Sequence, residues 1–122
     1  MEQKNFYVWG GVFAIAKTKK IIDGAFAVIQ DKNEITVIFE ESKIGENKSN
    51  IIEVENGYKI ITFDMVLPFG LVGFLAKISR ALAEANISIF AISAFSTDHI
   101  LVKQNDLLKT IEKLQEIGFY KK

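Results

Sequence analysis

Residues 65–99 read MVLPFGLVGFLAKISRALAEANISIFAISAFSTDH, and this stretch combines the patterns of a turn, a helix and a strand. Its central apolar residues recur at steps of three and four, which is typical of a helix buried on one side. They are Leu71, Phe74, Leu75, Ile78, Leu82 and Ala85. We predict a helix at about Phe69 to Ala85 that ends at a left-handed Asn86 and leads directly into a strand.

The turn before this helix is the first candidate for a functional site. Pro68 cannot donate a ladder hydrogen bond and ends the preceding strand, while Gly70 and Gly73 lack side chains where the backbone enters the helix. The first N–H groups of a helix have no internal partner and attract a carboxylate or phosphate. A Gly-x-x-Gly pair also serves simply to let a helix pack closely on a sheet, and both interpretations are open.

Strands and a second helix are predicted on either side of this stretch. Before it, the predicted strands are Phe6–Trp9, Val12–Ala16, Ala25–Ile29, Glu34–Phe39 and Tyr58–Leu67, with a polar surface connection at residues 40–56. After it, Ile87–Phe95 and His99–Lys103 form a hairpin around residues 96–98. The last helix spans about Asp106 to Ile117, with Asn105 as its N-cap and Gly118 at its end.

The two halves of the chain repeat with an offset of 64 residues, since Phe26-Ala27-Val28 aligns with Phe90-Ala91-Ile92. The second half has the β-α-β-β-α order of a ferredoxin-like sandwich, while the first half has no room for the long helix. We therefore expect an α+β protein with two tandem ferredoxin-like units in one compact body, at residues 1–57 and 58–122. Antiparallel sheets carry helices on one face, and the strand at Phe6–Trp9 completes the second unit's sheet.

The composition argues against several classes of function. The 15 basic and 15 acidic side chains balance, which disfavours binding to nucleic acid or to an anionic membrane. There is no cysteine, no segment with the ~20 apolar residues of a membrane span and no signal-peptide pattern, so we expect a cytoplasmic protein. One histidine, His99, and one arginine, Arg80, offer neither a catalytic pair nor a metal cluster, so no enzyme activity, metal or cofactor is expected.

Three segments resemble the ACT domain: residues 67–73 (LPFGLVG), 82–93 (LAEANISIFAIS) and 97–102 (TDHILV). They are most similar to the small tandem-ACT proteins related to the animal arginine sensor CASTOR. The resemblance is strong over residues 58–118 and weak over residues 12–41. It implies a regulatory module that binds an amino acid or a similar small metabolite between two ACT units and performs no chemistry on it.

The resemblance also implies which residues hold the ligand. The glycine turn would offer backbone groups to the α-carboxylate and α-amine, through Phe69, Gly70, Leu71, Val72 and Gly73. The hairpin would line the rest of the site with Phe95, Ser96, Thr97 and Asp98. Asp98 could receive an ammonium or guanidinium group, although it is also a common turn residue. The first half departs from the family pattern, because residues 29–32 (IQDK) replace a Thr-Arg-Thr type hairpin.

An alternative is an oligomerising protein-interaction module without a ligand, whose pocket is filled by Phe69, Phe74 or Phe95. A homodimer is expected under either hypothesis, because exposed edges of ferredoxin-like sheets pair readily.

Overall fold

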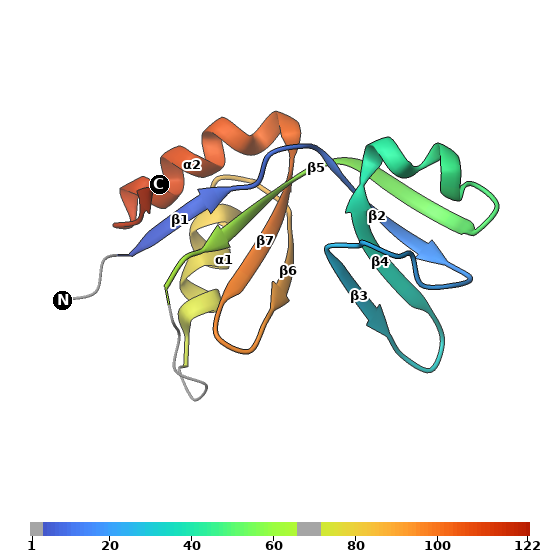
Figure 1. The fold of residues 1–122 in the computed structure, drawn as a ribbon. Coiled ribbons are helices and arrows are strands. Elements are labelled where there is room, and N and C mark those ends of the chain that lie inside the picture. Colours follow the sequence, from blue (N-terminus) through green and yellow to red (C-terminus); the bar gives the residue numbers. More distant parts are fainter. Residues whose placement is uncertain (1–3, 66–71) are drawn as a thin grey trace. The chain divides into compact units, whose positions relative to one another are not determined.

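The computed structural model describes residues 4–65 and 72–122, and the chain divides into two units. Unit 1 comprises Met1–Gly10 and Lys59–Lys122, and unit 2 comprises Gly11–Tyr58. The long strand β5 (Ile51–Phe63) contributes its first part to unit 2 and its last part to unit 1 (Figure 1). The α+β ferredoxin-like class predicted from the sequence is confirmed by this mixture of strands and helices.

Unit 1 contains a sheet in the order β6-β7-β5-β1-β8. Its further strands are β1 (Asn5–Val8), β6 (Ile89–Ser93), β7 (Asp98–Lys103) and β8 (Tyr120–Lys121). β1 pairs antiparallel with β5, with Phe6 opposite Phe63, so the N-terminal strand does complete this sheet. β8 departs from the expected antiparallel arrangement, because it pairs in parallel with the outer side of β1.

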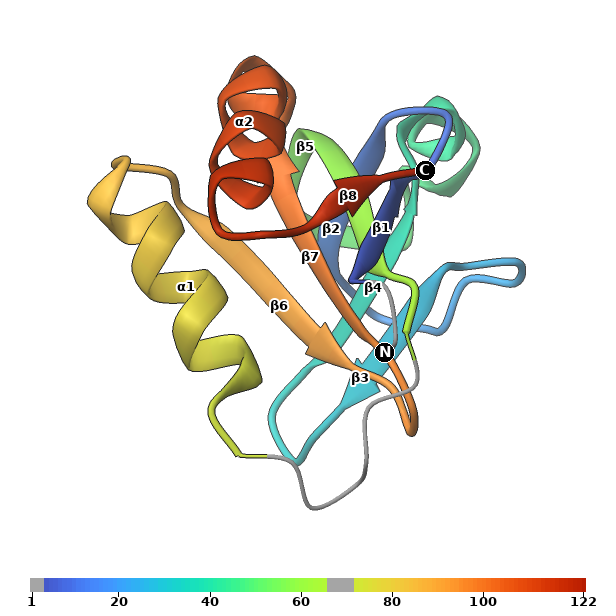
Figure 2. The same cartoon turned by 90° about the vertical axis from the view of Figure 1, so that its left-hand side faces the viewer.

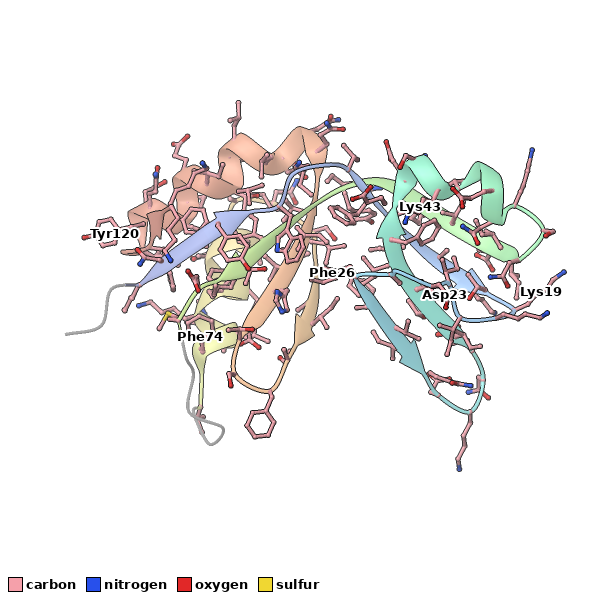
Figure 3. All side chains as sticks on the ribbon, in the orientation of Figure 1. Lys19, Asp23, Phe26, Lys43, Phe74 and Tyr120 are labelled. Atoms are coloured by element: carbon pink, nitrogen blue, oxygen red, sulfur yellow. The ribbon has the colours of Figure 1, made fainter. Side chains whose placement is uncertain are left out.

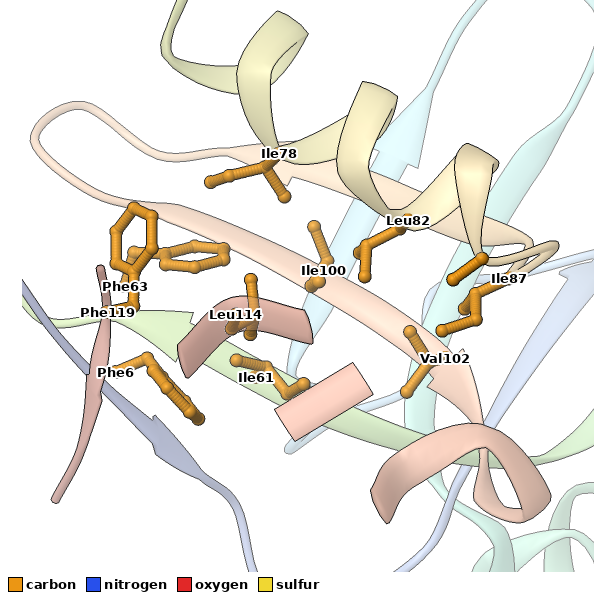
Figure 4. Packing of buried hydrophobic residues seen from close by; sticks show 11 residues of the cluster. Phe6, Ile61, Phe63, Ile78, Leu82, Ile87, Ile100, Val102, Leu114 and Phe119 are labelled. Carbon is orange, nitrogen blue, oxygen red and sulfur yellow. The ribbon is translucent and has the colours of Figure 1, made fainter. Parts of the chain in front are cut away.

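Two helices cover one face of the unit 1 sheet, as Figure 2 shows. They are α1 (Phe74–Glu84) and α2 (Leu107–Glu116), the latter preceded by a 3₁₀ turn, η3 (Gln104–Asp106). Ile78 and Leu82 of α1 are fully buried, because apolar residues at helical spacing place one face of α1 against the sheet. The core is completed by residues from β1, β5, β7 and α2, among them Phe6, Ile61, Phe63, Ile100, Val102 and Leu114 (Figure 4).

Unit 2 contains a sheet in the order β3-β4-β2-β5, with strands β2 (Phe13–Thr18), β3 (Ala27–Gln30) and β4 (Ile35–Glu40). The predicted β3–β4 hairpin is confirmed, and its turn is held by the Asp31 carboxylate, which accepts hydrogen bonds from the Asn33 and Glu34 N–H groups. Residues 19–26 form no helix, and the short 3₁₀ turns η1 (Glu41–Lys43) and η2 (Gly45–Asn47) follow β4. A separate core contains Ala14, Ala16, Ile22, Val37 and Phe39.

Most predicted strand boundaries differ from the structure by one or two residues, and three further predictions are wrong. β5 begins at Ile51 rather than Tyr58, because its first half pairs with β2. The prediction failed because this half exposes the charged Glu53 and Glu55, and such a polar sequence is typical of a surface connection. Within the described residues α1 begins at Phe74, since Gly73 has a left-handed φ of 89° that no helix continues. Asn105 lies inside η3 and is not the N-cap of α2, a position taken by Asp106 without a side-chain hydrogen bond.

Gly73 gives a first testable prediction. A Cβ added there would meet no described atom within 4 Å, so a substitution acts through the backbone, because the left-handed conformation is unfavourable for residues with a side chain. We expect Gly73→Ala to lower the free energy of unfolding by about 1 kcal/mol in urea denaturation. Gly45→Ala is the control, since its Cβ also meets nothing and its φ is not positive. Equal stability of the two variants would contradict the assigned backbone conformation.

Candidate ligand site

The N-terminus of α1 is a backbone donor site. Lys77 N–H makes the first helical bond, to the Gly73 carbonyl at 3.1 Å, so the N–H groups of Phe74, Leu75 and Ala76 have no partner inside the helix. No side-chain hydrogen bond caps this end within residues 4–65 and 72–122. The unpaired N–H groups and the helix dipole together favour a bound anion such as a carboxylate.

The β6–β7 hairpin lies at the same end of unit 1 as the start of α1, as both ribbon views show (Figures 1 and 2). Its turn is closed by a hydrogen bond from Ala94 N–H to the Thr97 carbonyl at 2.8 Å, and Ser93 pairs with Asp98 across the strands. The register of an antiparallel pair determines on which face of the sheet each side chain lies. The pairing of Ser93 with Asp98 therefore determines the face of the sheet on which the Asp98 side chain lies.

Asp98 lies on the helix-covered face of the unit 1 sheet. It is two residues before Ile100, which packs in the core beneath the helices, and strand alternation puts both on one face. Asp98 is only 9% exposed, and no hydrogen bond or ion pair to its carboxylate is found in the described parts of the chain. No buried side-chain oxygen of the described residues lacks a hydrogen-bond partner, so the unbonded carboxylate oxygens of Asp98 are in contact with solvent and can bind a cationic ligand atom.

The structure brings the predicted site residues together only in part. Phe69, Gly70 and Leu71 lie outside the described residues. Val72 and Phe95 are 91% and 81% exposed, which makes them rim residues rather than the walls of an enclosed pocket. Ser96 and Thr97 are half-buried in the hairpin turn, and Gly73 and Asp98 are placed as described above. The role of every one of these residues in binding stays a prediction.

Sequence reasoning missed a polar network on the opposite face of the same sheet. The indole Nε1–H of Trp9 donates to Thr62 Oγ1 at 2.7 Å, and the same oxygen lies 2.7 Å from Nδ1 of His99. When the His99 proton is on Nε2, Nδ1 accepts a hydrogen bond from the Thr62 hydroxyl group. In the other tautomer, Nδ1–H donates a hydrogen bond to Thr62 Oγ1. The sequence did contain a sign of this network. Thr62 and His99 alternate with the core residues of their strands, so they belong to the other face of the sheet.

The protonation of His99 gives a second testable prediction. Burial lowers the pKa of His99 below its ordinary value of 6.5, and the Asp98 carboxylate offsets part of this lowering. The unfolded chain then binds this proton more readily than the folded chain. We expect the free energy of unfolding to be undiminished above pH 6.5 and to fall as the pH drops through the folded-state pKa.

Chemical denaturation across this pH range measures the effect, and His99→Gln is the control that keeps a polar side chain without titrating. The difference between the parent and the variant isolates His99 from the carboxylates, which titrate at lower pH. A difference that is constant with pH would show that burial does not perturb this histidine.

Three further features bear on other kinds of site. No cluster of three or more His, Cys, Asp or Glu side chains that could hold a metal ion is found among residues 4–65 and 72–122. Arg80 lies within α1 rather than in a loop that could surround a phosphate group. None of the described helices is long and apolar enough to cross a membrane.

The sequence was compared with models of known protein families. The ACT domain model matches residues 53–116, which is more than half of the chain. The chain therefore belongs to the ACT domain family. A comparison with curated proteins found no match.

Solved structures with a similar fold come from several bacteria. An Agobacterium tumefaciens protein is 23% identical, with a TM-score of 0.82 over 100% of this chain and 94% of that chain. A Vibrio cholerae protein of unknown function is 19% identical, with a TM-score of 0.79 and coverage of 95% and 91%. The ligand-free regulatory subunit of Thermus thermophilus aspartate kinase is 10% identical, with a TM-score of 0.69 and coverage of 94% and 96%. At these identities the likeness concerns the fold.

Proposed function

We propose that this chain is a regulatory ACT protein that binds an amino acid at the end of unit 1 where α1 begins and the β6–β7 hairpin turns. The observation that carries the proposal is the pairing of unlike groups at this end. Backbone N–H groups of Phe74 to Ala76 suit a carboxylate, while the Asp98 carboxylate, which has no ion pair in the described residues, suits a cation. A free amino acid carries both charges on one small molecule.

The site chemistry favours an amino acid with a cationic side chain. The α-carboxylate would take the helix N-terminus, and a side-chain ammonium or guanidinium would take Asp98. The α-amine would then meet backbone carbonyl groups of the turn around Gly73. A relationship to the arginine sensors, inferred from the sequence, is consistent with this selection and is kept as part of the proposal.

The similar structures support regulation rather than catalysis. The Thermus thermophilus neighbour is described as a regulatory subunit, and a Porphyromonas gingivalis neighbour as a putative C-terminal regulatory domain of aspartate kinase. We propose that the present chain likewise performs no chemistry. A second ACT unit would cover the exposed rim at Val72 and Phe95 and enclose the ligand. A homodimer and a cytoplasmic location complete the proposal.

A thermal-shift screen against the standard amino acids tests this function. A ligand that binds only the folded chain, at a hundred times its dissociation constant, should raise the free energy of unfolding by ~2.7 kcal/mol. We expect lysine or arginine to raise the melting temperature more than their neutral counterparts. No shift with any amino acid would favour the interaction module instead. The 91% exposed Val72 would offer such a module an apolar contact surface, whereas the 81% exposed Phe95 does not fill a pocket as that hypothesis expected.

A further inference from the structure

The outer face of α1 carries charges that the fold of unit 1 does not use. Lys77, Arg80 and Glu84 are exposed and follow one another at steps of three and four, so they form one stripe along the helix. The stripe lies on the face turned away from the buried Ile78 and Leu82. From the N-terminus of α1 to its C-terminus, its charges read positive, positive, negative.

A surface hollow of about 370 Å³ lies along this stripe. It is lined by Ala76, Lys77, Arg80, Ala81 and Glu84 of α1 and by Ile117 just beyond α2. The alanines leave the floor free of bulky side chains, so another surface can approach the helix backbone closely. The lining of the hollow thus combines apolar side chains with charges of both signs.

The three charges have no ion-pair partner in the described parts of the chain. The ion pairs found there join Lys17 to Glu34, Lys113 to Glu116 and Lys122 to Asp64, and none involves α1. Arg80 and Glu84 are four residues apart on the same helix and still form no pair. Both groups are therefore available to an external partner.

The order of these charges is complementary to itself. When two identical helices pack antiparallel about a two-fold axis, a residue before the axis faces a residue after the axis on the partner. With the axis between positions 80 and 84, Arg80 faces the partner's Glu84, and the same contact forms a second time. Lys77 then lies toward the C-terminal end of the partner's α1, where the helix dipole is negative.

We propose that two copies of this chain pair antiparallel through the outer faces of α1, with Arg80 and Glu84 exchanging ion pairs across the two-fold axis. This rests on the homodimer proposed above and assigns its surface. A uniformly acidic partner such as a nucleic acid would be repelled by Glu84 at the C-terminal end of the stripe, whereas a second copy satisfies both signs. Because exposed ion pairs are weak and screened by salt, the dimer is salt-sensitive.

The proposal is tested by sedimentation velocity on the full chain at low salt over a range of protein concentrations. Arg80→Glu places like charges opposite each other at both contacts, and so does Glu84→Arg. We expect each variant alone to dimerise about tenfold or more weakly than the parent. Mixing the two variants makes both contacts attractive again, so we expect the mixture to form heterodimers with roughly the parental affinity.

Lys109→Glu, an exposed charge reversal on α2, is the control and should leave the parental association unchanged. Circular dichroism checks that all variants are folded. A mixture that stays monomeric, or variants that dimerise like the parent, would overturn the α1 interface. A parent chain that is monomeric throughout would overturn the homodimer as well. Amino-acid thermal shifts of the same variants report on the ligand site separately, because Arg80 and Glu84 lie outside it.

Discussion

Leu82→Ala should lower the free energy of unfolding of this protein by about 2–5 kcal/mol. Leu82 is fully buried and points from α1 toward the sheet, within the cluster that contains Ile87, Ile100 and Val102 (Figure 4). Truncation to alanine removes buried methyl groups and leaves a cavity that the surrounding strands cannot fill without moving. The cost is therefore both the lost burial and the lost contacts.

A thermal melt followed by circular dichroism measures this effect, and the expected fall in melting temperature is on the order of 10 °C. Leu108→Ala in α2 is the matched control, because the Leu108 side chain is 81% exposed and its loss should cost less than about 0.5 kcal/mol. If the two alanine variants melt alike, α1 does not pack on the sheet through the face assigned here.

Asp98→Asn should have the largest effect on ligand selection. Asp98 is the first residue of β7 and not part of the turn as the sequence indicated, so the substitution keeps the size of the side chain and the strand pairing but removes the charge that would hold a cationic group. A hydrogen bond between charged groups contributes about 1.5–3 kcal/mol, so we expect lysine or arginine to bind roughly 10- to 100-fold more weakly. Isothermal titration calorimetry measures the affinity directly.

A neutral amino acid of similar length, such as glutamine, is the ligand control for this variant. Its affinity should change little, because its side chain brings no charge to Asp98. The exposed Asp23→Asn is the protein control, since it removes one carboxylate from unit 2 (Figure 3). Equal loss of affinity for charged and neutral ligands would show that Asp98 acts through the hairpin structure and not through its charge.

Much of the fold could be predicted because local patterns and tertiary packing agree in unit 1. The apolar stripe of α1 faces the core, Asn86 ends the helix with a left-handed φ of 61°, and Gly118 follows α2 with a φ of 99°. The strand at Phe6 also pairs with β5 as expected. In each case the residue type suits the local backbone and the packing, which is why the sequence pattern was informative.

The errors arose where tertiary pairing overrides composition. Glu53 and Glu55 belong to a strand only because β2 supplies their ladder partners, and such long-range pairing is invisible in a local pattern. In the site, the glycine spacing did not show that Gly73 is the N-cap of α1, while the rest of the predicted glycine turn lies outside the described residues. The environments of Asp98 and His99 depend on strand alternation across the hairpin, so their burial on opposite faces required the pairing register.

Nuclear magnetic resonance with ¹⁵N-labelled protein is the most direct measurement of the central claim, that an amino acid binds where α1 begins and the β6–β7 hairpin turns. Titration with lysine and with arginine should shift the amide signals of Phe74, Leu75 and Ala76 together with those of Thr97 and Asp98. Amides in the β3–β4 hairpin of unit 2 serve as an internal reference. Signals that do not move, or that move only away from these two segments, would contradict the proposed site.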